Sequence, residues 1–142
     1  MFKFKWLIYS YLAVILIISA GGTMFQPKPQ NQDPGVGPVK KVEIGATIDT
    51  KMVADGKKLF MTKCFVCHDL DQKKIGPPLK NIYKERKPEY IMNLLVNAVQ
   101  MQKQDPFVKD LLKKYNNVLM PDPQITQAQA RTLLEYLRSV AK

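Results

Sequence analysis

The feature that most constrains this chain is the cluster Cys64-Phe65-Val66-Cys67-His68, which holds both cysteines and the one histidine of 142 residues. On a helical turn, positions i, i+3 and i+4 share a face, so two thiols and one imidazole should point at a common object. One histidine cannot supply a site that needs two imidazoles, and two cysteines cannot build a disulfide-dense scaffold. The length fits one domain of about 150 residues, which excludes a two-domain dinucleotide enzyme.

The C-x-x-C-H spacing indicates covalent attachment of one haem c, with a thioether bond from each thiol and the imidazole bound to the iron. A zinc site, a redox-active thiol pair and a structural disulfide each account for less of the cluster. A structural zinc ion needs four protein ligands, and Asp69 or Asp71 would complete the set only with strained geometry. A thioredoxin-like C-x-x-C belongs beside a strand, and a disulfide between Cys64 and Cys67 would leave His68 without a role.

Apolar residues recur at three- and four-residue spacing in four segments, which predicts an all-α domain. The segments are residues 50–63, 88–101, 105–115 and 126–141. None alternates with a period of two. A domain of about 93 residues has only a modest core, which a large apolar cofactor would enlarge.

Local signals mark where these helices begin. Asp105 is expected to cap the third helix, and Thr126 with Gln129 forms a capping box for the last one. Behind that box, the apolar stripe predicts a buried face, with the charged residues of the helix facing away from it. These charged residues are Arg131, Glu135 and Arg138.

Residues 1–25 form a basic and then apolar leader. Lys3 and Lys5 precede an uncharged run over residues 6–27, with small residues at 20–22. This pattern fits a cleaved secretory signal, and it also fits a retained anchor helix, since about 20 apolar residues cross a bilayer. A lipid anchor is not expected, because no cysteine lies near the end of the leader. Both interpretations place the rest of the chain on the periplasmic side of the inner membrane, either anchored or secreted.

Residues 26–49 are predicted to form an extended linker. Prolines and glycines between positions 27 and 38 break both helical and strand periodicity. Such a stretch is expected to be semi-rigid and not packed, with only Val42, Ile44 and Ile48 lying against the domain. The folded domain is therefore placed at residues 50–142.

Four further segments carry a resemblance to a known family. Residues 55–60 lead into the C-x-x-C-H cluster, and they are followed by Gly-Pro-Pro-Leu at 76–79, Met120-Pro121, and a Leu-x-x-Tyr-Leu pattern within residues 133–137. In this order, residues 50–142 resemble class I monohaem c-type cytochromes. The resemblance implies a small helical domain around one covalently bound haem, acting as a one-electron carrier and not as an enzyme.

The resemblance also implies roles for individual residues. His68 would be the proximal iron ligand, with its other ring nitrogen bonded to the carbonyl of Pro77, and Met120 would be the distal ligand. Gly76 and Leu79 would line the haem pocket.

The resemblance further implies that Gly56 allows the first and last helices to cross closely, with Phe60, Leu133 and Tyr136 packed around it. The segment from Gln100 to Met120 is longer than in minimal members of the family. The residues that hold the haem propionates therefore stay open, with Asn81 and Tyr83 as candidates.

Met120 also differs from the other methionines by its setting. It lies in a proline-flanked segment without helical period, whereas the methionines at 52, 61, 92 and 101 fall inside predicted helices, where methionine is ordinary core filler. A loop methionine can reach a buried iron more easily. Met92, Met101 or an open sixth position remain the alternatives.

The charge suggests a kind of partner. The formal charge is +10, and without Lys3 and Lys5 it is +8, from 20 basic against 12 acidic residues. Complementary charge steers short-lived encounters, so redox donors and acceptors with acidic docking surfaces are expected; a merely solvated lysine surface is the alternative. No nucleic-acid motif is present. The lysines nearest the haem motif are Lys57, Lys58, Lys63, Lys73, Lys74 and Lys80.

A respiratory-type electron carrier is thus the leading interpretation. The alternative is a haem-containing subunit, or a five-coordinate haem enzyme or sensor of peroxidase type. The sequence supplies no distal histidine or arginine pair of the kind that such an enzyme would use.

Overall fold

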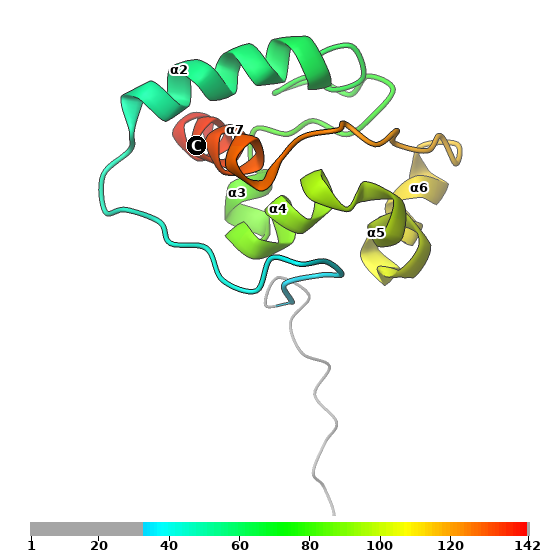
Figure 1. Ribbon diagram of the computed structural model, residues 1–142. Helices are drawn as coiled ribbons and strands as arrows, with labels where there is room; N and C mark the ends of the chain where they lie inside the picture. The colour runs from blue at the N-terminus through cyan, green and yellow to red at the C-terminus, as the bar shows by residue number, and fades with distance from the viewer. Residues whose placement is uncertain (1–32, 142) are drawn as a thin grey trace, which may run out of the picture.

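The computed structural model describes residues 33–141 (Figure 1). The leader predicted for residues 1–25 and the first part of the predicted linker, residues 26–32, lie outside this range. Between residues 33 and 141, no helix is long and apolar enough to cross a membrane. The same range contains helices and no strand, so the all-α prediction is confirmed.

All four helical segments predicted from the sequence are present, but the first and the second differ from the prediction in their detail. The elements are α2 (Thr50–Leu59), the π-helix η2 (Phe60–Cys64), α3 (Ile82–Glu85), α4 (Pro88–Val96), α5 (Ala98–Gln104), α6 (Pro106–Lys114) and α7 (Gln127–Val140). The first segment ends in the wider π turn. The second divides at Asn97, whose backbone leaves the helical region (φ −144°, ψ 38°) while its side chain donates to the carbonyl of Val36 at 3.1 Å.

The predicted caps are present. The Asp105 carboxylate accepts from the backbone N–H of Val108 at 2.9 Å, and the reciprocal bonds of a capping box join Thr126 and Gln129. A further cap, Asp49, accepts from Met52 N–H at the start of α2. These contacts join residues three apart, which is why a local pattern predicts them.

Helices α2 and α7 cross in close contact (Figure 1). A Cβ atom on Gly56 would lie 2.4 Å from the carbonyl oxygen of Thr132 and 2.7 Å from Cβ of Tyr136. The rings of Phe60 and Tyr136 meet at 5.5 Å between centroids, and Leu133 is buried beside them. The prediction that Gly56 permits this crossing is confirmed.

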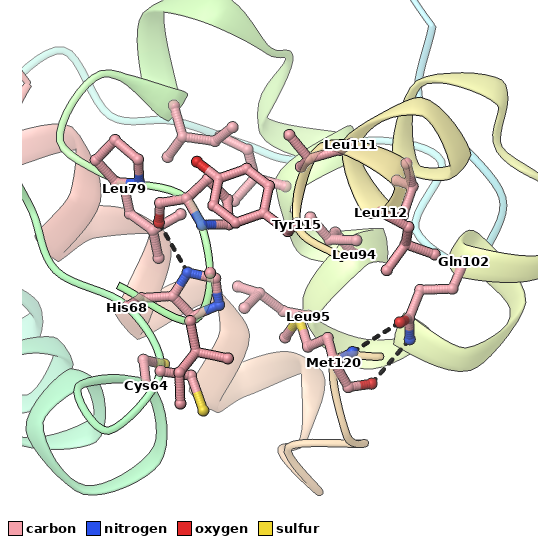
Figure 2. Close-up of a pocket in the computed structure, with 18 of the residues that line it drawn as sticks. Cys64, His68, Leu79, Leu94, Leu95, Gln102, Leu111, Leu112, Tyr115 and Met120 are labelled. Atoms are coloured by element: carbon pink, nitrogen blue, oxygen red, sulfur yellow. Dashed lines mark hydrogen bonds between the residues drawn. The ribbon is translucent and has the colours of Figure 1, made fainter. Parts of the chain in front are cut away.

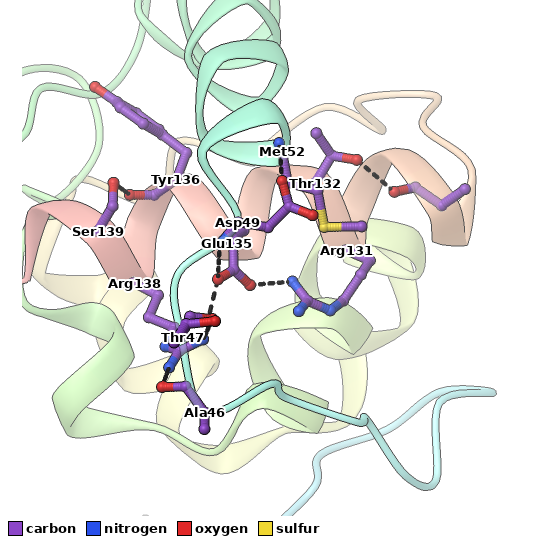
Figure 3. Close-up of polar contacts among 11 residues, drawn as sticks. Ala46, Thr47, Asp49, Met52, Arg131, Thr132, Glu135, Tyr136, Arg138 and Ser139 are labelled. Atoms are coloured by element: carbon purple, nitrogen blue, oxygen red, sulfur yellow. Dashed lines mark hydrogen bonds and ion pairs between the residues drawn. The ribbon is translucent and has the colours of Figure 1, made fainter.

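Glu135 of α7 does not face away from the core, contrary to the sequence prediction. Its side chain is 1% exposed. It pairs with Arg131 at 2.5 Å and with Arg138 at 3.0 Å, and accepts from the backbone N–H of Asp49 at 3.3 Å (Figure 3). The carboxylate is buried because the chain entering α2 covers it. It therefore joins the start of α2 to α7.

Residues 33–49, hereafter the strap, have irregular backbone but pack against the helices. Asn93 of α4 is fully buried and accepts from the N–H of Val39 at 2.9 Å. Its amide nitrogen donates to the carbonyls of Pro34 and Val39, each at 2.9 Å. A Cβ on Gly37 would lie 2.2 Å from the Asn93 side-chain oxygen, so glycine allows the strap to approach this closely.

The prediction that the linker does not pack is therefore wrong for this part of the strap. Prolines and glycines prevent regular structure, but they do not prevent close contact. Val42 and Ile44 do pack against the core, as expected, whereas Ile48 is 44% exposed. The domain boundary at residue 50 stays a prediction.

Candidate functional site

A largely apolar cavity of about 220 Å³ lies between the loop that follows η2, helices α4 to α6, and the loop before α7. Figure 2 shows its walls, with side chains from all of these segments directed inward. The apolar lining includes Leu79, Leu94, Leu95, Leu111 and Leu112. The cavity is therefore suited to a largely apolar ligand held by a few polar groups.

Cys64, Cys67 and His68 all line this cavity, as their spacing predicts. The backbone N–H of Phe65 donates to the carbonyl of Phe60, five residues back, and the N–H of His68 donates to that of Cys64 at 2.8 Å. A π turn followed directly by an α-like turn thus presents the three side chains together. Both thiols are free. Burial, and then the charge of Cys67, raises the pKa of the Cys64 thiol to about 11.

The loop after the motif holds the His68 ring. Nδ1 lies 2.9 Å from the carbonyl oxygen of Pro77, to which it donates when it carries the proton. A Cβ on Gly76 would lie 2.3 Å from Cε1 of the ring, so only glycine fits against it. Burial lowers the pKa of His68, while the bond to Pro77 acts in the opposite direction. The neutral ring is therefore oriented with Nε2 available.

Met120 also lines the cavity, on a different side from His68 (Figure 2). It lies in an irregular segment that begins after Asn116 and Asn117, both with a φ of 56°. Among the methionines of residues 33–141, it alone borders the cavity. Met92 and Met101 are buried in the core instead, in agreement with the ordinary role of methionine as core filler.

The donor set fits a haem c. Two thiols, one imidazole and one thioether face a cavity whose remaining walls are mostly apolar, as a covalently attached porphyrin requires. Within residues 33–141, no group of three or more His, Cys, Asp or Glu side chains is arranged to hold a metal ion. The two thiols, the imidazole and the thioether on the wall of this apolar cavity therefore match a porphyrin with its iron.

The candidates for the propionates do not lie on the cavity wall. Asn81 is exposed, and Tyr83 packs against the main core. Their neighbours Ile82 and Glu85 line the cavity instead. The single turn of α3, which the sequence did not predict, turns Asn81 and Tyr83 away.

Two parts of the site were missed from the sequence. Helix α6 forms a wall with Leu111 and Leu112, and Tyr115, which follows its last residue, extends that wall. The apolar stripe and the unusual length of this segment were the available signals. Gln102 of α5 is 9% exposed and contacts the backbone of Met120. A glutamine inside a helical pattern carries no signal for such a role.

Comparison with known proteins gives one family. The sequence profile of the family described as Cytochrome c matches residues 53–141. No curated protein sequence matches the chain significantly.

Solved structures agree with this match. The chain is similar to the structure of "Cytochrome c from rhodothermus marinus", with 41% identity and a TM-score of 0.75, covering 80% of this chain and 97% of that one. An engineered form of that cytochrome bound to a carbene intermediate gives 40% identity and a TM-score of 0.71, covering 80% and 98%. A cytochrome c domain of a Pseudomonas putida protein gives 27% and 0.53, covering 59% and 85%.

Proposed function

We propose, from the premise that this chain belongs to the cytochrome c family, that His68 and Met120 are the two axial ligands of its haem iron. The family resemblance seen in the sequence is confirmed. With it come one covalently bound haem c per chain and a role as an electron carrier. The ligands, the partners and the location go beyond the family assignment.

Cys64 and Cys67 would hold the haem through thioether bonds. They lie on one turn at the cavity wall, and they are the two cysteines of the chain. His68 follows on the same turn, and its bond to Pro77 would fix the ring so that Nε2 binds the iron. The haem, when bound, supplies the one-electron redox chemistry.

Met120 carries the argument for the second ligand. Of the methionines in the described part of the chain, it is the one that borders the cavity, and it approaches from a different side than His68 (Figure 2). A histidine–methionine pair raises the reduction potential and fills both axial positions. An iron with both of these positions occupied by protein ligands cannot bind a substrate. This supports the role of an electron carrier over that of an enzyme.

The test replaces Met120 with alanine in the haem-containing protein. We expect Met120→Ala to lower the reduction potential and to let the reduced protein bind carbon monoxide. Met92→Leu is the matched control, because Met92 is buried in the core and does not line the cavity. An unchanged potential and spectrum in Met120→Ala would overturn the assignment, and carbon monoxide binding by the unaltered protein would favour a five-coordinate enzyme or sensor.

The mouth of the cavity is proposed as the docking surface for acidic redox partners. Ile75, Val118 and Leu119 all line the cavity and are 53%, 49% and 67% exposed, so they form an apolar rim of the kind that marks interaction sites. Lys73 and Lys74 adjoin this edge in the sequence, with Lys73 over the ring of Tyr115 and Lys74 over that of Phe65. An apolar contact bordered by positive charge suits brief, oriented encounters.

Salt dependence tests this docking proposal. The electron-transfer rate with an acidic partner protein should fall steeply as ionic strength rises, because salt screens charges beyond about 10 Å at 0.1 M. Lys73→Gln should weaken the dependence of the rate on ionic strength. Lys51→Gln on α2 removes the same charge far from the mouth in sequence, so its salt dependence should be closer to that of the unaltered protein. A rate that does not change with salt would count against charge steering.

We place the protein on the periplasmic side of the inner membrane, between respiratory-type donors and acceptors. The support is the basic and apolar leader of residues 1–25. Membrane fractionation of the full chain separates a retained anchor from a cleaved signal: an anchored protein stays with the membrane after a high-salt wash.

A further inference from the structure

We infer that Gln102 is a positioning residue that holds Met120 against the cavity through a two-point contact with its backbone. The Met120 N–H donates to Oε1 of Gln102 at 2.7 Å, and Nε2 of Gln102 donates to the Met120 carbonyl at 2.8 Å (Figure 2). This inference rests on the proposed ligation by Met120.

A third hydrogen bond and burial hold the Gln102 side chain in place. Nε2 of Gln102 also donates to the carbonyl of Ala98 at 3.1 Å, so the amide is fixed to its own helix. The side chain is 9% exposed, which leaves little water to replace these bonds. Because residues 102 and 120 are far apart in sequence, the contact ties the irregular segment that carries Met120 to a helix on the cavity wall.

Helix α5, which carries Gln102, is itself held from the other side. Met101 accepts through its sulfur from the N–H of Val36 at 3.0 Å, and Asn97 donates to the carbonyl of Val36 at 3.1 Å. The strap therefore supports the helix that supports Met120. A rigid support of this type limits how far the Met120 sulfur can move.

The consequence is a low population of molecules in which Met120 has left the iron. An added ligand such as imidazole binds only to that population, so its apparent affinity reports the fraction directly. Loss of the two hydrogen bonds between the Gln102 side chain and the Met120 backbone should raise this fraction by about tenfold or more.

The experiment measures imidazole affinity of the oxidised, haem-containing protein. Gln102→Leu, which keeps the size of the side chain and removes both bonds, should raise the affinity by about tenfold. Gln104→Leu is the matched control, because Gln104 lies on the same helix and is exposed. Within residues 33–141, its side chain forms a hydrogen bond with Gln100 and with no other residue. This substitution should leave the affinity unchanged.

A double substitution separates this role from a general effect on the pocket. In a Met120→Ala background, imidazole binds without competition, and adding Gln102→Leu should have no further effect. An equal gain in both backgrounds would overturn the inference. If Met120→Ala itself changes nothing, the ligation proposal fails; if Met120→Ala has its effect and Gln102→Leu has none, only the role of Gln102 fails.

A second variant covers poor folding of Gln102→Leu. Gln102→Glu keeps the shape and the acceptor for the Met120 N–H but loses both donated bonds, so imidazole affinity should also rise. Hydrogen exchange at the Met120 amide gives a readout independent of ligand binding: the amide should be protected in the original protein and in Gln104→Leu, and lose protection in Gln102→Leu. An unprotected amide in the original protein would overturn the inference.

Discussion

Replacement of Gly56 by alanine sets helix propensity against helix packing. Within a helix, alanine is favoured over glycine by about 1 kcal/mol, so an isolated α2 would gain stability. In the folded domain, the added Cβ would lie 2.4 Å from the carbonyl oxygen of Thr132, where ordinary contact begins at 3.4 Å. The two helices would have to separate by about 1 Å, which costs packing around the contact.

The expected net effect is a loss of stability. Overpacking of a tight contact costs about 1–3 kcal/mol, occasionally more, and separation would also loosen the ring contact of Phe60 with Tyr136. We expect Gly56→Ala to lower the free energy of unfolding by about 1 kcal/mol, the middle of the overpacking range less the gain in propensity. Denaturant unfolding of the haem-containing protein, followed by far-ultraviolet circular dichroism, measures this directly.

Gly45→Ala supplies the control for this measurement. A Cβ at Gly45 meets its nearest neighbour, the carbonyl oxygen of Thr47, at 3.6 Å, which is ordinary contact. Its stability should therefore stay within about 0.5 kcal/mol of the original protein. If Gly56→Ala were as stable as the original, the close crossing of α2 and α7 would not be what requires glycine there.

Three more substitutions test contacts at the His68 ring, on α7 and beneath the strap. Gly76→Ala should displace the His68 ring, and the oxidised protein should show a five-coordinate or altered absorption spectrum; an unchanged spectrum would mean that the loop yields instead. Glu135→Gln should lower the thermal midpoint through a loss of about 1–3 kcal/mol, less than for a fully buried pair because both arginines are partly exposed, and the difference should persist at high salt because the carboxylate is buried. Asn93→Ala should cost about 2–4 kcal/mol and release the Val39 amide to hydrogen exchange, because three backbone groups of the strap lose their partner.

The parts that could be predicted from the sequence depend on neighbours along the chain. The capping box of Thr126 and Gln129 joins residues three apart, and the cluster from Cys64 to His68 shares one turn. The family resemblance added contacts between distant residues, such as the one between α2 and α7 at Gly56.

The parts that were missed depend on contacts between distant residues that no local pattern encodes. Asn97 breaks a helical stripe because its side chain bonds to the strap, 61 residues away. Glu135 occupies a position that looks solvent-facing until the chain before α2 covers it. Gln102 meets Met120 only in the folded chain, because the two residues lie 18 apart in the sequence on different segments.

The strap shortens the distance that an anchored form of this carrier could travel. With the strap bound to α4 and α5, the chain from residue 25 to Asp33 spans eight residues and reaches at most about 28 Å, against about 88 Å for a link that ran freely to residue 50. If residues 1–25 are retained as an anchor, the volume open to the tethered domain would fall by about thirtyfold, and its effective concentration near a partner in the same membrane would rise by the same factor. Three hydrogen bonds at Asn93 would thus favour fast, repeated exchange with a fixed neighbour over long-range diffusion.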